Sequence, residues 1–186
     1  MKKEIEVKIK LEEGEKNALF RVLKEKFQGI FKPGFRQKTY QFFTDDFSSQ
    51  KVFPRIRNEI DKTFTLTVKV KEDKASQYFE RKEYTIEISN ISEAAAILKA
   101  FGFKNMVAWE KVRHDCRVPK LPVELSFDKT PMGWFLEIEG DKKNIEKTLK
   151  IFDLDDRPKI NRAYLGLWKD YKKKFKLKKR DMLFGK

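Results

Sequence analysis

Cysteine and histidine are almost absent from this chain of 186 residues: Cys116 and His114 are the only ones. A single cysteine cannot form an internal disulfide, which fits the reducing cytoplasm, where we expect the protein to be located. Zinc sites usually combine several cysteine and histidine ligands, so a site of that kind is excluded. His114 has no nucleophile arranged around it in the sequence, and we expect structural roles for both residues.

Long apolar runs and glycine-rich motifs are also missing. No apolar run approaches the roughly 20 residues that a membrane-spanning helix requires, so no membrane partner is expected. The first residues lead directly into a charged strand rather than into the apolar core of a signal peptide. Gly29 and Gly34 do not form a phosphate-binding loop, which needs a strand, a glycine-rich turn and a Lys-Ser/Thr pair.

Positive charge is abundant, with 43 lysines and arginines against 29 acidic residues and a net charge of +14. Much of the excess lies between Lys169 and Arg180. Two interpretations of this segment stay open: a solvated helix end, or a surface that attracts anions or nucleic acid. We find no RNA-binding motif and do not expect a nucleic-acid partner, but the positive field should speed the arrival of a polyanionic substrate.

Charged residues alternate with apolar ones in several short segments. In the first, Glu4-Ile5-Glu6-Val7-Lys8, the charged side chains share one face of a strand and the apolar ones share the other. The alternation recurs at residues 53–57, 66–71, 81–88, 110–113 and 135–139. A flat sheet could turn the charged face to solvent. A closed antiparallel β-barrel of about eight strands would enclose it as a charged lumen, with helices on the outside, and we predict this α+β fold.

The types of charge indicate what such a lumen would bind. Glutamates fall near the two ends of the strand set, and arginines and lysines fall between them. Grouped carboxylates repel one another and need a cation, and an all-oxygen set suits Mg²⁺ or Mn²⁺. Arginine and lysine at fixed spacing suit phosphate oxygens. We expect carboxylates on one side of the lumen and basic residues on the other, around a metal-bound polyphosphate.

These segments, taken in order, resemble the CYTH, or triphosphate tunnel metalloenzyme, superfamily. The likeness begins with Glu4-x-Glu6-x-Lys8 and covers most of the chain. Its further matches are Arg55-x-Arg57, Thr67-x-Lys69, Arg81-x-Glu83 with Glu87, Lys111-x-Arg113, and Asp128 followed by Gly133 and Glu137-x-Glu139. The superfamily includes class IV adenylyl cyclases, thiamine triphosphatases and inorganic triphosphatases. The resemblance implies the tunnel fold and a triphosphate substrate.

The resemblance and the charge pattern together suggest roles for the lumen residues. The expected ligands of Mg²⁺ or Mn²⁺ are Glu4, Glu6, Asp128, Glu137 and Glu139. The expected triphosphate-binding residues are Lys8, Arg55, Arg57, Lys69, Lys71, Arg81, Lys111 and Arg113. Glu83 and Glu87 are expected as additional lumen carboxylates. Lys8 and Lys69 are the catalytic candidates, as general bases activated by neighbouring cations.

Three functions stay open. Hydrolysis of a triphosphate, such as tripolyphosphate, ATP or thiamine triphosphate, comes first because it requires only a tunnel, a metal and water. The alternative is a class IV adenylyl cyclase, which converts ATP to cyclic AMP and pyrophosphate and also needs a nucleoside pocket. A non-catalytic polyphosphate- or nucleotide-binding protein comes third, because anion binding has no use for the carboxylates. The resemblance also allows a homodimer.

Four helices are expected around the strands. They span residues 12–28, 93–101, 141–152 and a stretch from 161 into the lysine-rich tail. Ser92 would cap the second helix and Asp141 the third, and residues 73–77 are expected to form a turn. Because no low-complexity linker interrupts the chain, residues 1–186 should form a single domain that ends in a basic helix and tail at about residues 161–186.

Overall fold

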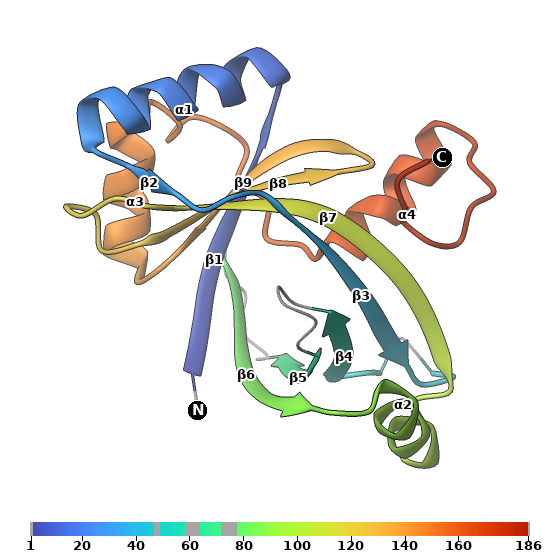
Figure 1. The fold of residues 1–186 in the computed structure, drawn as a ribbon. Helices are drawn as coiled ribbons and strands as arrows, with labels where there is room; N and C mark the ends of the chain where they lie inside the picture. Colours follow the sequence, from blue (N-terminus) through green and yellow to red (C-terminus); the bar gives the residue numbers. More distant parts are fainter. Residues whose placement is uncertain (1, 47–48, 59–63, 72–77, 186) are drawn as a thin grey trace.

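The computed structural model describes residues 2–46, 49–58, 64–71 and 78–185 (Figure 1). Within these ranges the strands are β1 (Lys2–Leu11), β2 (Ile30–Phe31), β3 (Phe35–Phe43), β4 (Val52–Asn58), β5 (Phe64–Lys71), β6 (Phe79–Ile88), β7 (Asn105–Arg117), β8 (Glu124–Thr130) and β9 (Gly133–Glu139). The helices are α1 (Glu13–Phe27), α2 (Ile91–Ala100), α3 (Lys142–Ile151) and α4 (Tyr164–Lys174). The turn expected at residues 73–77 lies outside the described residues.

The strands close into an antiparallel barrel. The order β7-β3-β4-β5-β6-β1-β9-β8 returns to β7 through a β7–β8 pairing, and the short strand β2 pairs with the end of β7. The helices lie outside this ring (Figure 1). The predicted α+β fold with a closed barrel of eight strands is therefore confirmed. β3 and β8 complete the ring beyond the six alternating segments, and β2 is an additional strand.

The strand register turns the charged faces inward. Residues directly opposite each other in paired strands share a face, and the charged positions of one strand repeatedly oppose those of the next. Lys8 in β1 is opposite Glu137 in β9, and Lys69 in β5 is opposite Glu83 in β6. The tight β8–β9 hairpin that brings Glu137 back to the lumen uses Gly133 at a φ of 112°, a backbone conformation that favours glycine.

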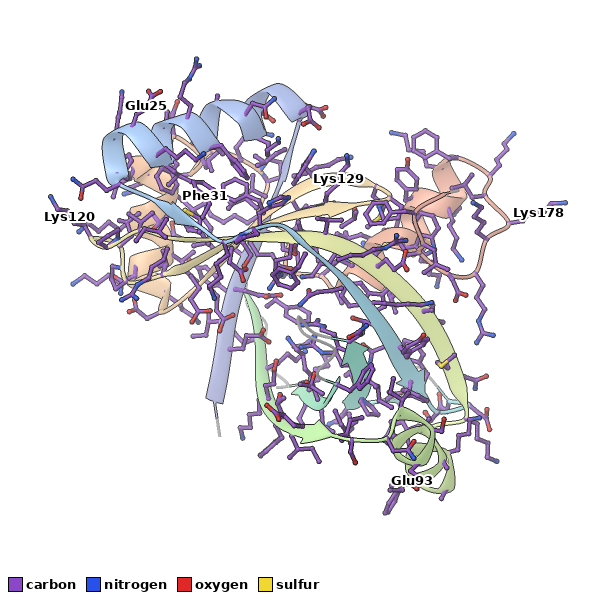
Figure 2. The ribbon with its side chains drawn as sticks, viewed as in Figure 1. Glu25, Phe31, Glu93, Lys120, Lys129 and Lys178 are labelled. Atoms are coloured by element: carbon purple, nitrogen blue, oxygen red, sulfur yellow. The ribbon has the colours of Figure 1, made fainter. Side chains whose placement is uncertain are left out.

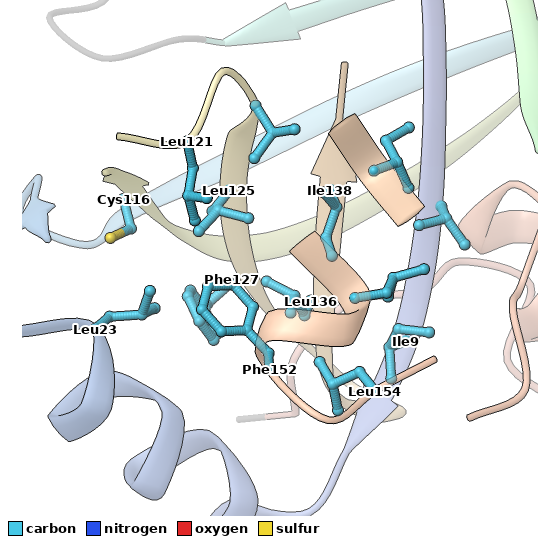
Figure 3. Packing of buried hydrophobic residues seen from close by; sticks show 14 of the residues in the cluster. Ile9, Leu23, Cys116, Leu121, Leu125, Phe127, Leu136, Ile138, Phe152 and Leu154 are labelled. Atoms are coloured by element: carbon cyan, nitrogen blue, oxygen red, sulfur yellow. The ribbon is translucent and has the colours of Figure 1, made fainter. Parts of the chain in front are cut away.

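The main apolar core lies outside the barrel wall, beneath α1 and α3. The outward residues Val7 and Ile9 of β1, with Ile138 of β9, are almost completely buried there. Figure 3 shows this packing, with Leu23 of α1 and Phe152 after α3 facing the strands. A smaller cluster joins α2 to the outer face of β3, β4 and β5. The alternation of the strands thus serves two purposes, since one face builds the core and the other builds the lumen.

Cys116 and His114 lie on the outward side of β7. Cys116 is buried in the main core, and burial raises the pKa of its thiol to about 11. The His114 ring packs near Phe20 and Trp134. Both residues therefore have the structural surroundings that the sequence predicted.

Two helix starts differ from the sequence prediction. The expected cap Ser92 is wrong, because the Asn90 side chain accepts hydrogen bonds from the backbone of Ser92 and Glu93 and caps α2. The predicted cap of α3 is confirmed, since Asp141 accepts from the Asn144 amide at 2.8 Å. The last helix begins at Tyr164, three residues later than expected, and Ile160 before it forms an isolated backbone bridge with Lys8.

The chain beyond α4 leaves the helix and returns to the barrel. Met182 forms an isolated parallel bridge with Trp109 of β7, and its amide donates to the Ala108 carbonyl at 3.0 Å. Met182 packs in a second cluster with Tyr164 and Trp168. Lys178 projects outward from this segment (Figure 2). Within the described ranges, every helix is too short or too polar to be a membrane span.

Candidate active site

Three carboxylates meet inside the barrel where β1 pairs with β9. Glu6 and Glu139 are directly opposite each other, and Glu4 lies on the same face of β1, two residues earlier. One carboxylate oxygen from each of the three lies within 4.8 Å of the others. We call these residues the β1–β9 carboxylates. Their oxygens are the ligand type that Mg²⁺ and Mn²⁺ prefer, so this group could hold a divalent cation.

The electrostatics of Glu4 show that these carboxylates are crowded. Burial raises the pKa of Glu4, and the neighbouring charges of Glu6 and Glu83 raise it further. The Lys69 ammonium pairs with Glu4 and acts in the opposite direction, but the pKa stays above its ordinary value. A divalent cation would relieve the repulsion, and the residues present therefore fit one.

Lys8 and Lys69, the two candidate bases, are both held by carboxylates. Lys8 has an exposed side-chain fraction of only 2%, pairs with Glu6 and lies 3.5 Å from a Glu137 oxygen. Burial alone would lower the pKa of Lys8, but Glu6 and Glu137 raise it above its ordinary value. Lys69 lies 3.0 Å from Glu83. Lys8 is therefore held in its charged form, which suits binding a phosphate better than accepting a proton.

A second group of charges surrounds Asp128 of β8, whose side chain is completely buried. Lys111 donates to its Oδ2 atom at 2.7 Å, and Arg113 donates to both carboxylate oxygens at 2.7 Å. The hydroxyl of Tyr164 also donates to Oδ2, at 2.9 Å. Asp128 is thus surrounded by donors from β7 and α4, and it is not one of the three grouped β1–β9 carboxylates.

Glu137 of β9 belongs to the same group, and we call Asp128, Glu137, Lys111 and Arg113 the Asp128 cluster. Arg113 pairs with Glu137, and Lys111 lies 3.9 Å from it. Burial would raise the pKa of Glu137, but Lys111 and Arg113 hold it well below its usual range. Burial, together with the charge of Arg113, lowers the pKa of Lys111 to about 8. The predicted metal ligands therefore divide between two surroundings.

Arginines of β4 continue the charged wall. Arg55 lies 3.6 Å from Glu83. Burial acts to raise the pKa of Glu83, but Lys69 and Arg55 overcome it and bring this pKa to about 2. Arg57 is buried and donates from Nε to the Thr39 hydroxyl at 3.2 Å. Both arginines thus face the lumen, as the alternation predicted.

The remaining predicted residues lie on β5 and β6. Arg81 is opposite Glu4 and Lys71 in the two neighbouring strands, and its guanidinium lies 4.2 Å from the centroid of the Phe79 ring. Lys71 and Glu87 are exposed. These two residues share the face of their strands with the lumen set but contact solvent, so they belong to its outer parts.

The expected separation of charges inside the lumen is wrong. The sequence suggested carboxylates on one side and basic residues on the other, but the register places Lys8 opposite Glu137 and Lys69 opposite Glu83. Buried charges of one sign are costly without an opposite partner, and interleaving supplies that partner in the absence of a ligand.

Two aromatic residues of the lumen were not among the predicted site residues. Trp109 lies on the inward face of β7, with its ring centroid 5.9 Å from the Lys111 ammonium, and its buried indole N–H has no acceptor among the described residues. Trp109 and Lys111 are two residues apart on one strand and therefore share a face, and this spacing could have indicated that Trp109 faces the lumen. Tyr164 reaches Asp128 from a helix, and no strand pattern signals such a contact.

A closed barrel with an ion-paired lumen and grouped carboxylates at its wall defines the tunnel class of β-barrel. The chain belongs to the CYTH family, whose domain matches residues 2–164. Residues 165–186 follow this match. The family that the sequence motifs indicated is therefore confirmed.

Solved structures support the same fold. A conserved hypothetical protein from Pyrococcus furiosus is 22% identical with a TM-score of 0.66, and the match covers 88% of this chain and 99% of that one. A protein described as a putative adenylate cyclase from Vibrio parahaemolyticus is 16% identical with a TM-score of 0.68, over 89% of this chain and 97% of that one.

A putative adenylyl cyclase from Hippeastrum, described as having a dominant triphosphatase activity, is 18% identical with a TM-score of 0.64, over 92% of this chain and 96% of that one. At these identities the likeness establishes the fold alone. No curated protein matches the chain significantly.

Proposed function

We propose that the protein is a metal-dependent enzyme that hydrolyses a triphosphate bound in the barrel lumen. The observation that carries this proposal is the grouping of Glu4, Glu6 and Glu139 within 4.8 Å, beside lysines and arginines that face the same lumen. Basic residues alone would be enough to bind an anion. Three crowded carboxylates would weaken that binding unless a divalent cation joined them.

The β1–β9 carboxylates would hold Mg²⁺ or Mn²⁺. Bound there, the cation would neutralise phosphate charge and lower the pKa of an attacking water. Asp128 and Glu137 have a different task in this proposal, because they already accept charged hydrogen bonds from Lys111 and Arg113. They fix the direction of those two side chains.

The basic residues would bind the triphosphate oxygens in exchange for part of their present carboxylate pairing. The proposed set, from the deeply buried to the exposed, is Lys8, Lys111, Arg57, Lys69, Arg55, Arg113, Arg81 and Lys71. Phosphoryl transfer is mainly a matter of positioning and charge neutralisation, and these residues supply both. A cation held by Glu4 would compete with the Lys69 ammonium for that carboxylate, so Lys69 is our candidate for proton transfer.

One observation favours adenylyl cyclisation as the second candidate. Trp109 presents a flat ring and a buried, unsatisfied indole N–H beside Lys111, among the described residues of the lumen. Such a ring could stack on a nucleobase, or its in-plane N–H could donate to one. Hydrolysis requires no such pocket, so a contribution of Trp109 to the use of ATP, and none to the use of tripolyphosphate, would favour the cyclase.

The purified protein should be incubated with tripolyphosphate, ATP or thiamine triphosphate, each with Mg²⁺ or Mn²⁺, and the products separated by chromatography. Release of orthophosphate without a cyclic product supports the proposal and ranks the substrates. Cyclic AMP with pyrophosphate would replace it with the cyclase. Tight binding without turnover would leave a binding protein and overturn hydrolysis.

A further inference from the structure

Asp128 has a partner that comes from outside the barrel. Lys111 and Arg113 approach it from the neighbouring strand β7, but Tyr164 is the first residue of α4. The Tyr164 side chain is almost completely buried, and its hydroxyl donates to Asp128 Oδ2 at 2.9 Å. The ring also lies 5.5 Å from each of the ammonium groups of Lys8 and Lys111, measured to its centroid. One helical residue therefore contacts the basic residues of two strands.

The segment that carries Tyr164 is attached on both sides. Before it, Ile160 exchanges backbone hydrogen bonds with Lys8 of β1, at 2.9 and 3.2 Å. After α4, the Asp181 carboxylate accepts from the Ala108 amide of β7 at 3.0 Å, next to the Met182 bridge. We call Asp181 and Met182 the C-terminal latch. The segment is thus attached to β1 and β7, the strands that carry Lys8 and Lys111.

We propose that Tyr164 is a positioning residue for triphosphate binding, and that the C-terminal latch holds it against Asp128. Oδ2 of Asp128 accepts from Lys111, Arg113 and Tyr164 at once, so the direction of the carboxylate depends on all three donors. The Tyr164 hydroxyl is the only one of these donors without a charge, and it would not leave Asp128 when phosphate oxygens attract the two cations.

This inference rests on the proposed function and adds the α4 segment to the site. The latch residues lie outside the 2–164 match to the family, so their role in holding Tyr164 rests on the contacts of this chain. Without the hydroxyl, Asp128 would keep its charged donors but lose the fixed contact that opposes their movement. Substrate binding should suffer, while the fold should keep its packing because phenylalanine fills the same space.

Tyr164→Phe tests the inference, with Tyr171→Phe as the matched control, since Tyr171 is on the same helix but stacks against Trp168. Binding of tripolyphosphate is measured by calorimetry in EDTA, which isolates the basic residues from the metal. We expect Tyr164→Phe to raise Kd about tenfold, the loss of about one charged hydrogen bond, and Tyr171→Phe to leave it unchanged. With metal present, KM should rise by a similar factor while kcat changes less than about twofold.

The outcomes separate the inference from the proposed function. Equal tripolyphosphate binding by Tyr164→Phe and the wild type overturns the inference alone. Absence of binding by the wild type, both in EDTA and with Mg²⁺ or Mn²⁺ present, overturns the proposed function and the inference with it. A lower melting temperature with an unchanged KM would show a merely structural role and would also overturn the inference.

Asp181→Ala tests the latch separately, because it removes a hydrogen bond accepted from a backbone amide of β7 and not from a charged lumen side chain. A rise of about two- to fivefold in KM, with kcat unchanged, supports the latch. A KM equal to that of the wild type would overturn this part of the proposal.

Discussion

Glu4 and Glu137, one from each carboxylate group of the lumen, are the same kind of side chain in opposite electrostatic states. Among the β1–β9 carboxylates, burial and the charges of Glu6 and Glu83 raise the pKa of Glu4. In the Asp128 cluster, Lys111 and Arg113 overcome burial and hold the pKa of Glu137 well below its usual range. Glu4 and Glu137 both face the lumen, from the paired strands β1 and β9, so the direction of the side chain does not explain the difference.

The balance of neighbouring charges does explain it. Glu137 lies near Lys8, Lys111 and Arg113. Glu4 pairs with Lys69 and is opposite Arg81, but it also faces other carboxylates. In a group with enough basic partners, the protein alone balances the carboxylate charge, and the carboxylates can hold the basic side chains in place. A carboxylate group that has too few basic partners is stabilised by an external cation. This contrast underlies our proposal that the β1–β9 carboxylates hold the metal and that the Asp128 cluster positions phosphate-binding residues.

The largest effect should follow from a substitution among the β1–β9 carboxylates, the proposed metal ligands. Glu6→Gln removes one ligand and should lower tripolyphosphate turnover more than about 100-fold, or about 2.7 kcal/mol of transition-state stabilisation. The fold should persist, because Lys8 keeps Glu137 when it loses Glu6, and repulsion within the group falls. Phosphate release measures turnover and thermal melting measures stability. Glu25→Gln, on the exposed surface of α1, is the control (Figure 2). An active Glu6→Gln variant would contradict the account.

A large effect on stability should follow from breaking the Asp128 cluster. Asp128→Asn leaves Lys111 and Arg113 buried with one carboxylate between them, and breaking a buried pair costs about 3–5 kcal/mol. Glu139→Gln removes one of three crowded carboxylates and, without metal, should lower the free energy of unfolding by less than Asp128→Asn does. Urea denaturation compares the two variants. A similar loss in both would remove the distinction between the groups.

A smaller effect should appear as pH dependence through Lys111. Its pKa is about 8 in the folded protein and 10.5 as its ordinary value, so the unfolded chain binds more protons between these values. The free energy of unfolding should therefore rise from pH 8 to 10.5, while tripolyphosphate affinity falls as the ammonium is lost. Lys111→Arg keeps the charge and should weaken both trends. Identical pH profiles for Lys111→Arg and the wild type would contradict this assignment.

The faces of the strands could be predicted from the sequence, but their partners could not. Alternation alone places Glu4, Glu6 and Lys8 on one side of β1. That Glu6 meets Glu139 depends on a pairing between strands more than a hundred residues apart, which no local pattern specifies. The interleaving of charges depends on the same register, so the expected separation of signs failed with it.

The α4 contact was still harder to predict. Tyr164 reads as an ordinary apolar-face residue of a helix, and only the pairing of Ile160 with Lys8 fixes where that helix begins. The metal, the substrate, the extent of the domain and the role of the basic tail all stay predictions.

The most direct measurement is a calorimetric titration with Mn²⁺ of the wild type, Glu139→Gln and Glu137→Gln, each below its unfolding temperature. The two substitutions are chemically identical and two residues apart on β9. The account predicts that the wild type and Glu137→Gln bind Mn²⁺, and that Glu139→Gln binds it at least about tenfold more weakly, or about 1.4 kcal/mol. Undiminished binding by Glu139→Gln, with loss in Glu137→Gln, would contradict the central claim.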